Sequence, residues 1–266
     1  LFVLFPHGKI SPVQQRQMTT SAASNVHALS IDGNFDDCQD LVKAMFNDLK
    51  FRDQFALSGV NSINWGRIMA QITYYFSAAL SLGAPDRSVS FTVPTGNFGD
   101  IFAGYAAMRM GLAIEKLVIA TNDNDILART LETGTYEKRG VTATTSPSMD
   151  IQISSNFERL LFEASERDSS AVRAMMAGFK QSGSFTIAEK PLESIRKGFS
   201  AGRSNLAETS SMIASMQKAN GYLIDPHSAV GFKVARDAES SSTPMVVLST
   251  AHPAKFAEIV EPIIGR

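Results

Sequence analysis

Short apolar runs alternate along the chain with longer segments in which apolar residues recur every three or four positions. The runs are rich in Val, Ile, Phe and Thr, which favours buried strands, whereas the longer segments favour helices that bury one face. The expected strands are 1–5, 26–31, 88–93, 116–121 and 245–250. Because alternating strands and helices are typical of parallel sheets flanked by helices, the pattern predicts an α/β fold.

Two changes along the chain indicate how this fold is divided. From 154 to about 220 the apolar residues recur only at helical spacing, so we expect an insertion made of helices alone. We expect residues 1–60 to belong to a smaller, mobile α/β domain and residues 61–266 to form a larger one. Because the apolar run 1–5 has no initiator Met before it, we also expect the natural protein to have a further N-terminal portion.

Composition and charge narrow the class of ligand. The chain has 266 residues, of which 44% are hydrophobic, and a formal net charge of -1. Since it has no run of Lys or Arg, we expect neither a nucleic-acid partner nor an anionic membrane, and a small molecule is the expected ligand. Cys38 is the only cysteine, which excludes an intrachain disulfide and is typical of a cytoplasmic protein.

The segment 93–100 lies where an expected strand changes into a helix. Gly96 and Gly99 lack a Cβ, so backbone amides beside them can approach an anion closely. The first turn of the following helix adds unpaired N–H groups and the positive end of the helix dipole. This combination favours a phosphate-binding loop, although a tight turn alone would also use two glycines. Neither a Walker A string nor G-x-G-x-x-G is present, so a nucleotide is not favoured.

Other polar clusters also fall at the expected ends of strands or starts of helices, where ligands of α/β proteins converge. These clusters are Lys9 with Ser11, Asn61–Arg67, Asp225–Ser228 and Ser249–His252. Each has a structural alternative as well, because Lys and Arg are common surface charges and Asn and Asp are common helix caps. The four histidines lack metal-ligand spacing and G-x-S-x-G is absent, so we expect neither a metal site nor a serine hydrolase.

Taken together, five strings resemble the threonine synthase family. In chain order they are Pro6–Pro12, Asn61–Arg67, Pro94–Asp100, Asp225–Ala229 and Ser249–Phe256. The likeness covers essentially the whole chain, and Gly-Asn-Phe-Gly-Asp and Ser-Thr-Ala-His-Pro-Ala-Lys-Phe are its most specific parts. The resemblance implies a pyridoxal-phosphate enzyme of the tryptophan-synthase-β-like class, fold type II. Such an enzyme converts O-phospho-L-homoserine and water into L-threonine and phosphate.

The resemblance also implies a role for individual residues. Five consecutive residues would hold the cofactor phosphate in the larger domain, namely Gly96, Asn97, Phe98, Gly99 and Asp100. Thr250 would hydrogen-bond the pyridine nitrogen of the cofactor. Four residues would contact the substrate phosphate, namely Lys9, Ser11, Asn64 and Arg67.

The chain departs from the family at one point. Threonine synthases carry their Schiff-base lysine in a Phe-Lys-Asp string upstream of the opening strand, followed by Ser-Gly-Asp-Thr-Gly, and neither string occurs here. We therefore expect no catalytic residue among these residues, and we expect the 266-residue piece to be inactive alone. Two alternatives stay open, which are a threonine-synthase-like phospholyase for another amino-acid phosphate ester and a non-catalytic protein that binds phosphorylated metabolites.

Overall fold

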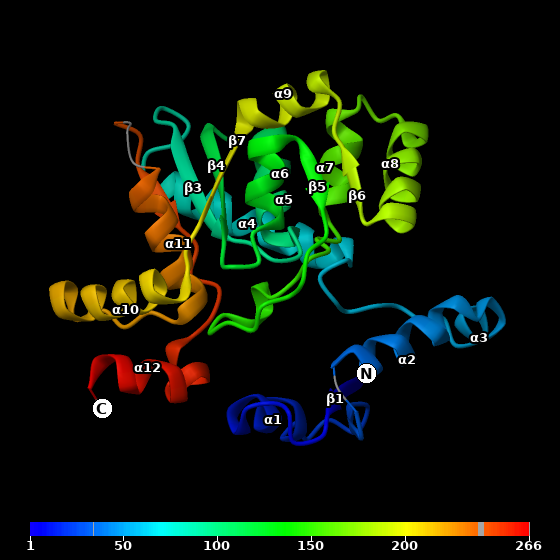
Figure 1. The fold of residues 1–266 in the computed structure, drawn as a ribbon. Helices are drawn as coiled ribbons and strands as arrows, with labels where there is room; N and C mark the ends of the chain where they lie inside the picture. Colours follow the sequence, from blue (N-terminus) through cyan, green and yellow to red (C-terminus); the bar gives the residue numbers. More distant parts are fainter. Residues whose placement is uncertain (34, 239–241, 266) are drawn as a thin grey trace. The chain divides into compact units, whose positions relative to one another are not determined.

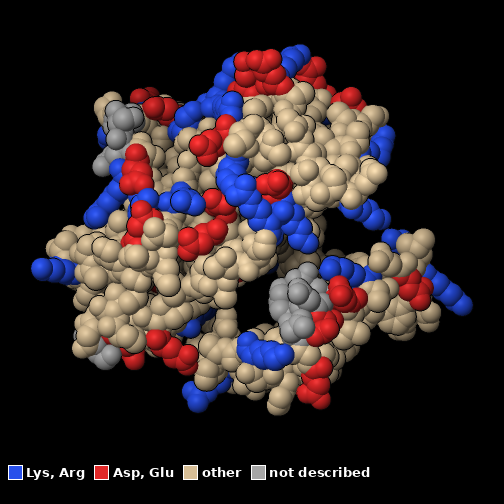
Figure 2. Space-filling model, in the orientation of Figure 1, with Lys and Arg blue, Asp and Glu red and all other residues tan. Residues whose placement is uncertain are grey.

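The computed structural model describes residues 1–33, 35–238 and 242–265, and it divides into two compact units, Leu1–Gly59 and Val60–Arg266 (Figure 1). Parallel strands flanked by helices occur in both units, which confirms the predicted α/β fold. Figure 2 shows acidic and basic side chains interspersed on the face that it draws. Within the described residues no helix is long and apolar enough to cross a membrane.

In its described residues, the smaller unit contains one pair of strands and three helices. Strand β1 (Phe2–Pro6) pairs in parallel with β2 (His27–Ile31), and α1 (Pro12–Thr19) connects them. The remaining helices of this unit are α2 (Phe35–Asn47) and α3 (Leu49–Gln54). The parallel pairing requires a crossover connection, which α1 provides.

A four-stranded parallel sheet forms the centre of the larger unit. Its strands, in spatial order, are β7 (Phe199–Arg203), β4 (Ile114–Thr121), β3 (Val89–Pro94) and β8 (Met245–Val247). From β3 the chain moves outward in one direction, to β4 and then to β7, whereas β8 returns on the other side of β3. The order of the strands therefore reverses between β3 and β8. In open α/β sheets, ligands bind outside the carboxyl ends of the strands at such a reversal.

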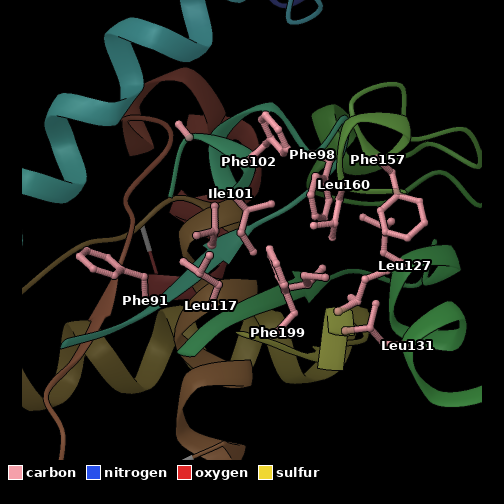
Figure 3. Packing of buried hydrophobic residues seen from close by; sticks show 14 of the residues in the cluster. Phe91, Phe98, Ile101, Phe102, Leu117, Leu127, Leu131, Phe157, Leu160 and Phe199 are labelled. Atoms are coloured by element: carbon pink, nitrogen blue, oxygen red, sulfur yellow. The ribbon is translucent and has the colours of Figure 1, made fainter. Parts of the chain in front are cut away.

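Helices cover both faces of this sheet. Helix α5 (Gly99–Arg109) packs on β3 and β4 and lies against α4 (Trp65–Ser81), whereas α11 (Pro226–Asp237) contacts β3, β4 and β7. Along β4 the buried residues alternate, so that Leu117 and Ile119 join the cluster formed with α5, and Val118 and Ala120 join the one formed with α11. Figure 3 shows Leu117 in the first cluster together with Phe98, Phe157 and Phe199.

The segment after residue 154 is not made of helices alone, and that expectation was wrong. Four helices are present, namely α7 (Phe157–Ala164), α8 (Ser169–Ser182), α9 (Glu189–Gly198) and α10 (Leu206–Asn220). Between them, however, β6 (Ser184–Thr186) pairs antiparallel with β5 (Thr135–Glu137), and β7 joins the central sheet. Strand β7 reads Phe-Ser-Ala-Gly-Arg and has one neighbour, so it lacks the apolar run of a strand with neighbours on both sides.

The last expected strand is shorter than predicted. Strand β8 ends at Val247, although Leu248 N–H still donates to Thr92 O at 3.0 Å, and residues 249 and 250 lie beyond the sheet. The remaining elements are α6 (Ile126–Thr133), two short 3-10 helices at Pro147–Met149 and Pro253–Phe256, and α12 (Ala257–Ile264).

Candidate functional site

The loop that follows β3 turns its carbonyl groups toward the segment 154–156. Ser154 Oγ donates to Gly96 O at 2.7 Å, and both Nδ2 and the backbone N of Asn156 donate to Asn97 O, at 2.9 and 3.1 Å. In a trans peptide the C=O group and the following N–H group point in opposite directions. These contacts therefore direct the N–H groups of Asn97 and Phe98 away from the segment 154–156.

The amide groups of this loop find no acceptor within the described parts of the chain. Thr95 N–H donates to Ala120 O at 2.8 Å and Phe102 N–H donates to Phe98 O at 3.0 Å, but the N–H groups of residues 96–100 have no such bond. Unpaired, consecutive amides at a helix N-terminus form a cradle for a phosphate group. We call residues 96–100 the cradle, and the binding of a phosphate there stays a prediction.

Phe98, rather than either glycine, adopts the left-handed backbone conformation of the loop. Its φ is 64° and its ψ is 3°, and it occupies the N-cap position of α5. A non-glycine residue in this region costs on the order of 1 kcal/mol or more. The ring is buried against Phe157 and Phe199, with centroids 5.3 and 5.9 Å away (Figure 3). Burial of the ring offsets the backbone strain and fixes the turn.

The two glycines differ in what they make room for. A Cβ at Gly96 would lie 2.6 Å from Ser148 O, so this glycine is required for close packing against the 3-10 helix at Pro147–Met149. At Gly99 a Cβ would come no closer than 3.4 Å to Asn156 Nδ2 and Ser62 O. The sequence predicts that both glycines allow the close approach of a ligand, whereas the structure shows that Gly96 also serves the packing of the protein itself.

The side chain of Asp100 faces the protein interior. Tyr75 Oη donates to Asp100 O at 2.9 Å and to Asp100 Oδ1 at 3.2 Å, and Tyr75 is fully buried. Burial raises the pKa of Asp100 to about 6, and the hydrogen bond from Tyr75 opposes that rise. The same burial raises the pKa of Tyr75 well above its ordinary value. Asp100 therefore offers its N–H group to the cradle, while its carboxyl group ties α5 to α4.

The start of α4 holds two of the predicted substrate residues. Asn64 is the N-cap, and its Oδ1 accepts a hydrogen bond from Gly66 N–H at 2.8 Å. Arg67 is exposed one turn later. The structure links this region to the loop, because Asn156 Nδ2 donates to Ser62 O at 3.0 Å as well as to Asn97 O.

The segment 154–156 was missed in the sequence. Ser and Asn just before a helix are typical of caps, which is how such residues are normally interpreted. Asn156 is indeed at the N-cap of α7, yet its side chain makes no capping hydrogen bond and is 1% exposed. A buried polar side chain at an N-cap position that makes no capping hydrogen bond indicates another role. Only the structure reveals this combination.

Thr250 lies at the same edge of the sheet as the loop. The register pairs Thr92 of β3 with Val247 of β8, so the residues that follow both strands emerge side by side. Thr250 is exposed there. Its neighbour Ser249 has its Oγ 3.1 Å from Ser228 Oγ, which fixes this stretch to the start of α11.

The cluster at Asp225 is a buried helix cap. Asp225 Oδ1 accepts hydrogen bonds from the N–H and from Nδ1 of His227, each at 2.9 Å, and Oδ2 accepts from Ser228 Oγ. Burial favours the protonated acid, but the hydrogen bonds from His227 and Ser228 outweigh it and lower the pKa of Asp225. His227 Nε2 in turn accepts from Ser148 N–H at 3.4 Å. This cluster therefore supports the loops around the cradle.

Lys9 and Ser11 belong to the smaller unit. Ser11 caps α1 in a capping box with Gln14, whose N–H lies 3.2 Å from Ser11 Oγ. Lys9 is exposed in the preceding turn. The structure thus brings Asn64 and Arg67, but not Lys9 and Ser11, into one unit with the cradle.

Comparisons with known proteins agree with this architecture. The family model "Threonine synthase, C-terminal" matches residues 228–266. The chain is 51% identical to the threonine synthase of Pseudomonas aeruginosa, over 98% of this chain and 56% of that protein. It is 46% identical to the threonine synthase of Saccharomyces cerevisiae, over 98% of this chain and 54% of that protein. The chain therefore spans about half the length of the curated relatives that it matches.

Solved structures give the same result. A crystal structure described as PLP-bound threonine synthase from Brucella melitensis is 71% identical with a TM-score of 0.96, covering 100% of this chain and 57% of that one. The threonine synthase from yeast is 44% identical with a TM-score of 0.89, covering 99% and 55%. Maize serine racemase shares the fold alone, at 11% identity and a TM-score of 0.61, covering 99% and 70%. Over nearly its whole length the chain is therefore similar to threonine synthases, of which it spans somewhat more than half.

Proposed function

We propose that this chain is the part of a threonine synthase that holds the phosphate of pyridoxal phosphate, and that the complete enzyme converts O-phospho-L-homoserine and water into L-threonine and phosphate. The observation that carries the proposal is the run of unpaired N–H groups at residues 96–100, located where the strand order reverses. The Brucella protein described as PLP-bound supports it, because its sequence is 71% identical to this chain.

The residues present fit the cofactor at both of its ends. The amides of residues 96–100 would bind its phosphate, and Ser154 and Asn156 fix the direction of the Asn97 and Phe98 N–H groups. Thr250, at the adjacent strand end, would hydrogen-bond the pyridine nitrogen. A neutral hydroxyl does not hold that nitrogen protonated as a carboxylate would, so Thr250 would moderate the electron demand of the ring. When bound, the cofactor supplies an electron sink for negative charge that develops on substrate carbons.

The remaining predicted residues would bind and orient the substrate. Arg67 is exposed beside the N-cap of α4, where its planar guanidinium can bind a phosphate through two N–H groups. Asn64 fixes the start of this helix. Lys9 would add a positive charge, and the hydroxyl of Ser11 would donate a hydrogen bond while its oxygen caps α1. These four residues would place the phosphate ester without taking part in proton transfer.

We assign no catalytic residue within this chain. The lysine that the family uses for its Schiff base would lie in the part of the complete protein that the chain does not span, which agrees with its 56% coverage of the Pseudomonas relative. We also propose a cytoplasmic enzyme that acts on a small molecule, in agreement with the single, unpaired and buried Cys38.

The test uses the full-length natural protein that contains these residues. We expect it to purify with bound cofactor, seen by visible absorbance, and to release L-threonine and phosphate from O-phosphohomoserine in equal amounts. Preferred turnover of another phospho-amino acid would instead support the phospholyase alternative. A native product of only these 266 residues by intact-mass analysis, with no turnover, would support the non-catalytic alternative.

A further inference from the structure

We propose, building on the function proposed above, that Asn156 is a positioning residue that couples the cofactor-phosphate cradle to the start of α4. The cradle is the loop at residues 96–100, and the start of α4 carries Asn64 and Arg67. One buried side chain joins the two, because Asn156 Nδ2 donates to Asn97 O at 2.9 Å and to Ser62 O at 3.0 Å.

Every hydrogen-bonding group of the Asn156 side chain is used. Its two N–H donors go to backbone carbonyls of two different segments, and its Oδ1 accepts from Arg159 Nε at 3.0 Å. An amide has only these two donors, so both segments depend on the same group. The residue is 1% exposed, and water therefore cannot readily replace a lost bond.

Arg159 completes the connection to α4. It orients the Asn156 amide through Oδ1, and its Nη2 donates to Ile63 O at 3.0 Å. Its guanidinium also lies over the ring of Trp65, 5.7 Å from the centroid. The consecutive carbonyls of Ser62 and Ile63 therefore accept hydrogen bonds from Asn156 and Arg159. Trp65, the first residue of α4, packs on the guanidinium of Arg159.

The two hydrogen bonds of Asn156 fix the orientation of one peptide group in the cradle and one before α4. Holding Asn97 O fixes the direction of Phe98 N–H in the cradle, and holding Ser62 O fixes the turn that precedes the Asn64 cap. A shift of the cradle on binding an anion therefore moves the start of α4 through Asn156. The Ser154 side chain differs, because its Oγ donates to Gly96 O and makes no bond to α4 among the described residues.

The variant Asn156→Asp tests the coupling in the full-length apoenzyme. It keeps the size and the acceptor for Arg159 but replaces the two donors by an oxygen that faces two carbonyl oxygens. We expect inorganic phosphate, measured by ³¹P NMR, to bind about tenfold more weakly, since two buried hydrogen bonds are lost. We also expect KM for O-phosphohomoserine to rise together with the cofactor dissociation constant.

Trp65 provides a readout that does not depend on activity, since it is the only Trp in this chain. Saturation with inorganic phosphate should change its emission in the wild type and in Ser154→Ala, but not in Asn156→Asp. Subtraction of a Trp65→Phe variant isolates the signal. Thr130→Val serves as the matched control, because it removes a buried hydroxyl that bonds to Ile126 O, and it should lower Tm without changing either response.

A wild-type Trp65 response in Asn156→Asp at phosphate saturation would overturn the coupling, whatever reaction the enzyme catalyses. Absence of phosphate and cofactor binding in the wild type would instead contradict the proposed function. If Asn156→Asp does not fold, Asn156→Ala decides the question, because it removes the same two donors without adding a negative charge. It should also abolish the Trp65 response at phosphate saturation. An unchanged Trp65 response in Asn156→Ala would reject the coupling.

Discussion

The hydroxyl of Tyr75 contacts both the backbone carbonyl and the carboxyl group of Asp100, at 2.9 and 3.2 Å. Tyr75 lies in the middle of α4, and Asp100 is the second residue of α5. One buried phenol therefore positions the helix turn whose amides form the cradle. This contact also places an acidic group in the protein interior.

The variant Tyr75→Phe should destabilise the protein. It removes the only polar atom of a fully buried ring and leaves the carboxyl group of Asp100 without that donor, which typically costs about 1–3 kcal/mol. Chemical denaturation at pH 7 would measure the loss. Tyr74→Phe is the control, because Tyr74 is exposed, and equal stability of the two variants would contradict the prediction.

Asp100 should make stability depend on pH. Its pKa in the folded protein is about 6 because burial disfavours the charged form, whereas an unfolded Asp titrates near 3.8. The folded state therefore binds the extra proton between these values, so stability falls as the pH rises through this range. The loss is on the order of 2–3 kcal/mol from about pH 4 to pH 6.

The variant Asp100→Asn removes this titration while it keeps an acceptor for Tyr75. Unfolding free energies measured for wild type and variant at several pH values should converge at pH 4 and separate by pH 7, with the variant the more stable. Parallel curves would show that Asp100 is ionised in the folded protein throughout this range.

The sequence predicted the central strands well, because strands buried on both faces must be apolar along their length. Both 88–93 and 116–121 correspond to β3 and β4. Strand β7 was not predicted from an apolar run, because it lies at the edge of the sheet and only Phe199 is fully buried there. The cradle was predictable as a strand-to-helix junction with two glycines, which is a local pattern.

The support of the cradle was not predictable from local patterns. Asn156 lies 59 positions from Asn97, and no periodicity relates residues that far apart. The left-handed backbone conformation of Phe98 could not be predicted from the sequence either, because it depends on the burial of its ring against Phe157 and Phe199. Sequence patterns identify the elements that carry a site, whereas tertiary contacts decide which atoms face a ligand.

The two glycines of the cradle should respond differently to a methyl group. Gly96→Ala would bring a Cβ within 2.6 Å of a backbone oxygen, so we expect a lower Tm and poor cofactor retention. Gly99→Ala places its Cβ at ordinary contact distance and should keep the wild-type Tm. Gly99→Leu should fold but retain less cofactor, because its side chain would block the approach of an anion to the amides. Unchanged cofactor absorbance in Gly99→Leu would place the phosphate elsewhere.

Thr250→Val should change the chemistry more than the fold. The substitution removes a hydroxyl at nearly constant volume from an exposed residue beyond the end of β8, so Tm should stay the same. We expect a shifted absorbance maximum of the bound cofactor and lower kcat, since the pyridine nitrogen would lose its hydrogen bond. Thr133→Val, an exposed helical Thr of α6 outside the site, is the control. If spectrum and kcat of Thr250→Val both match this control, the hydroxyl that contacts the pyridine nitrogen belongs to another residue.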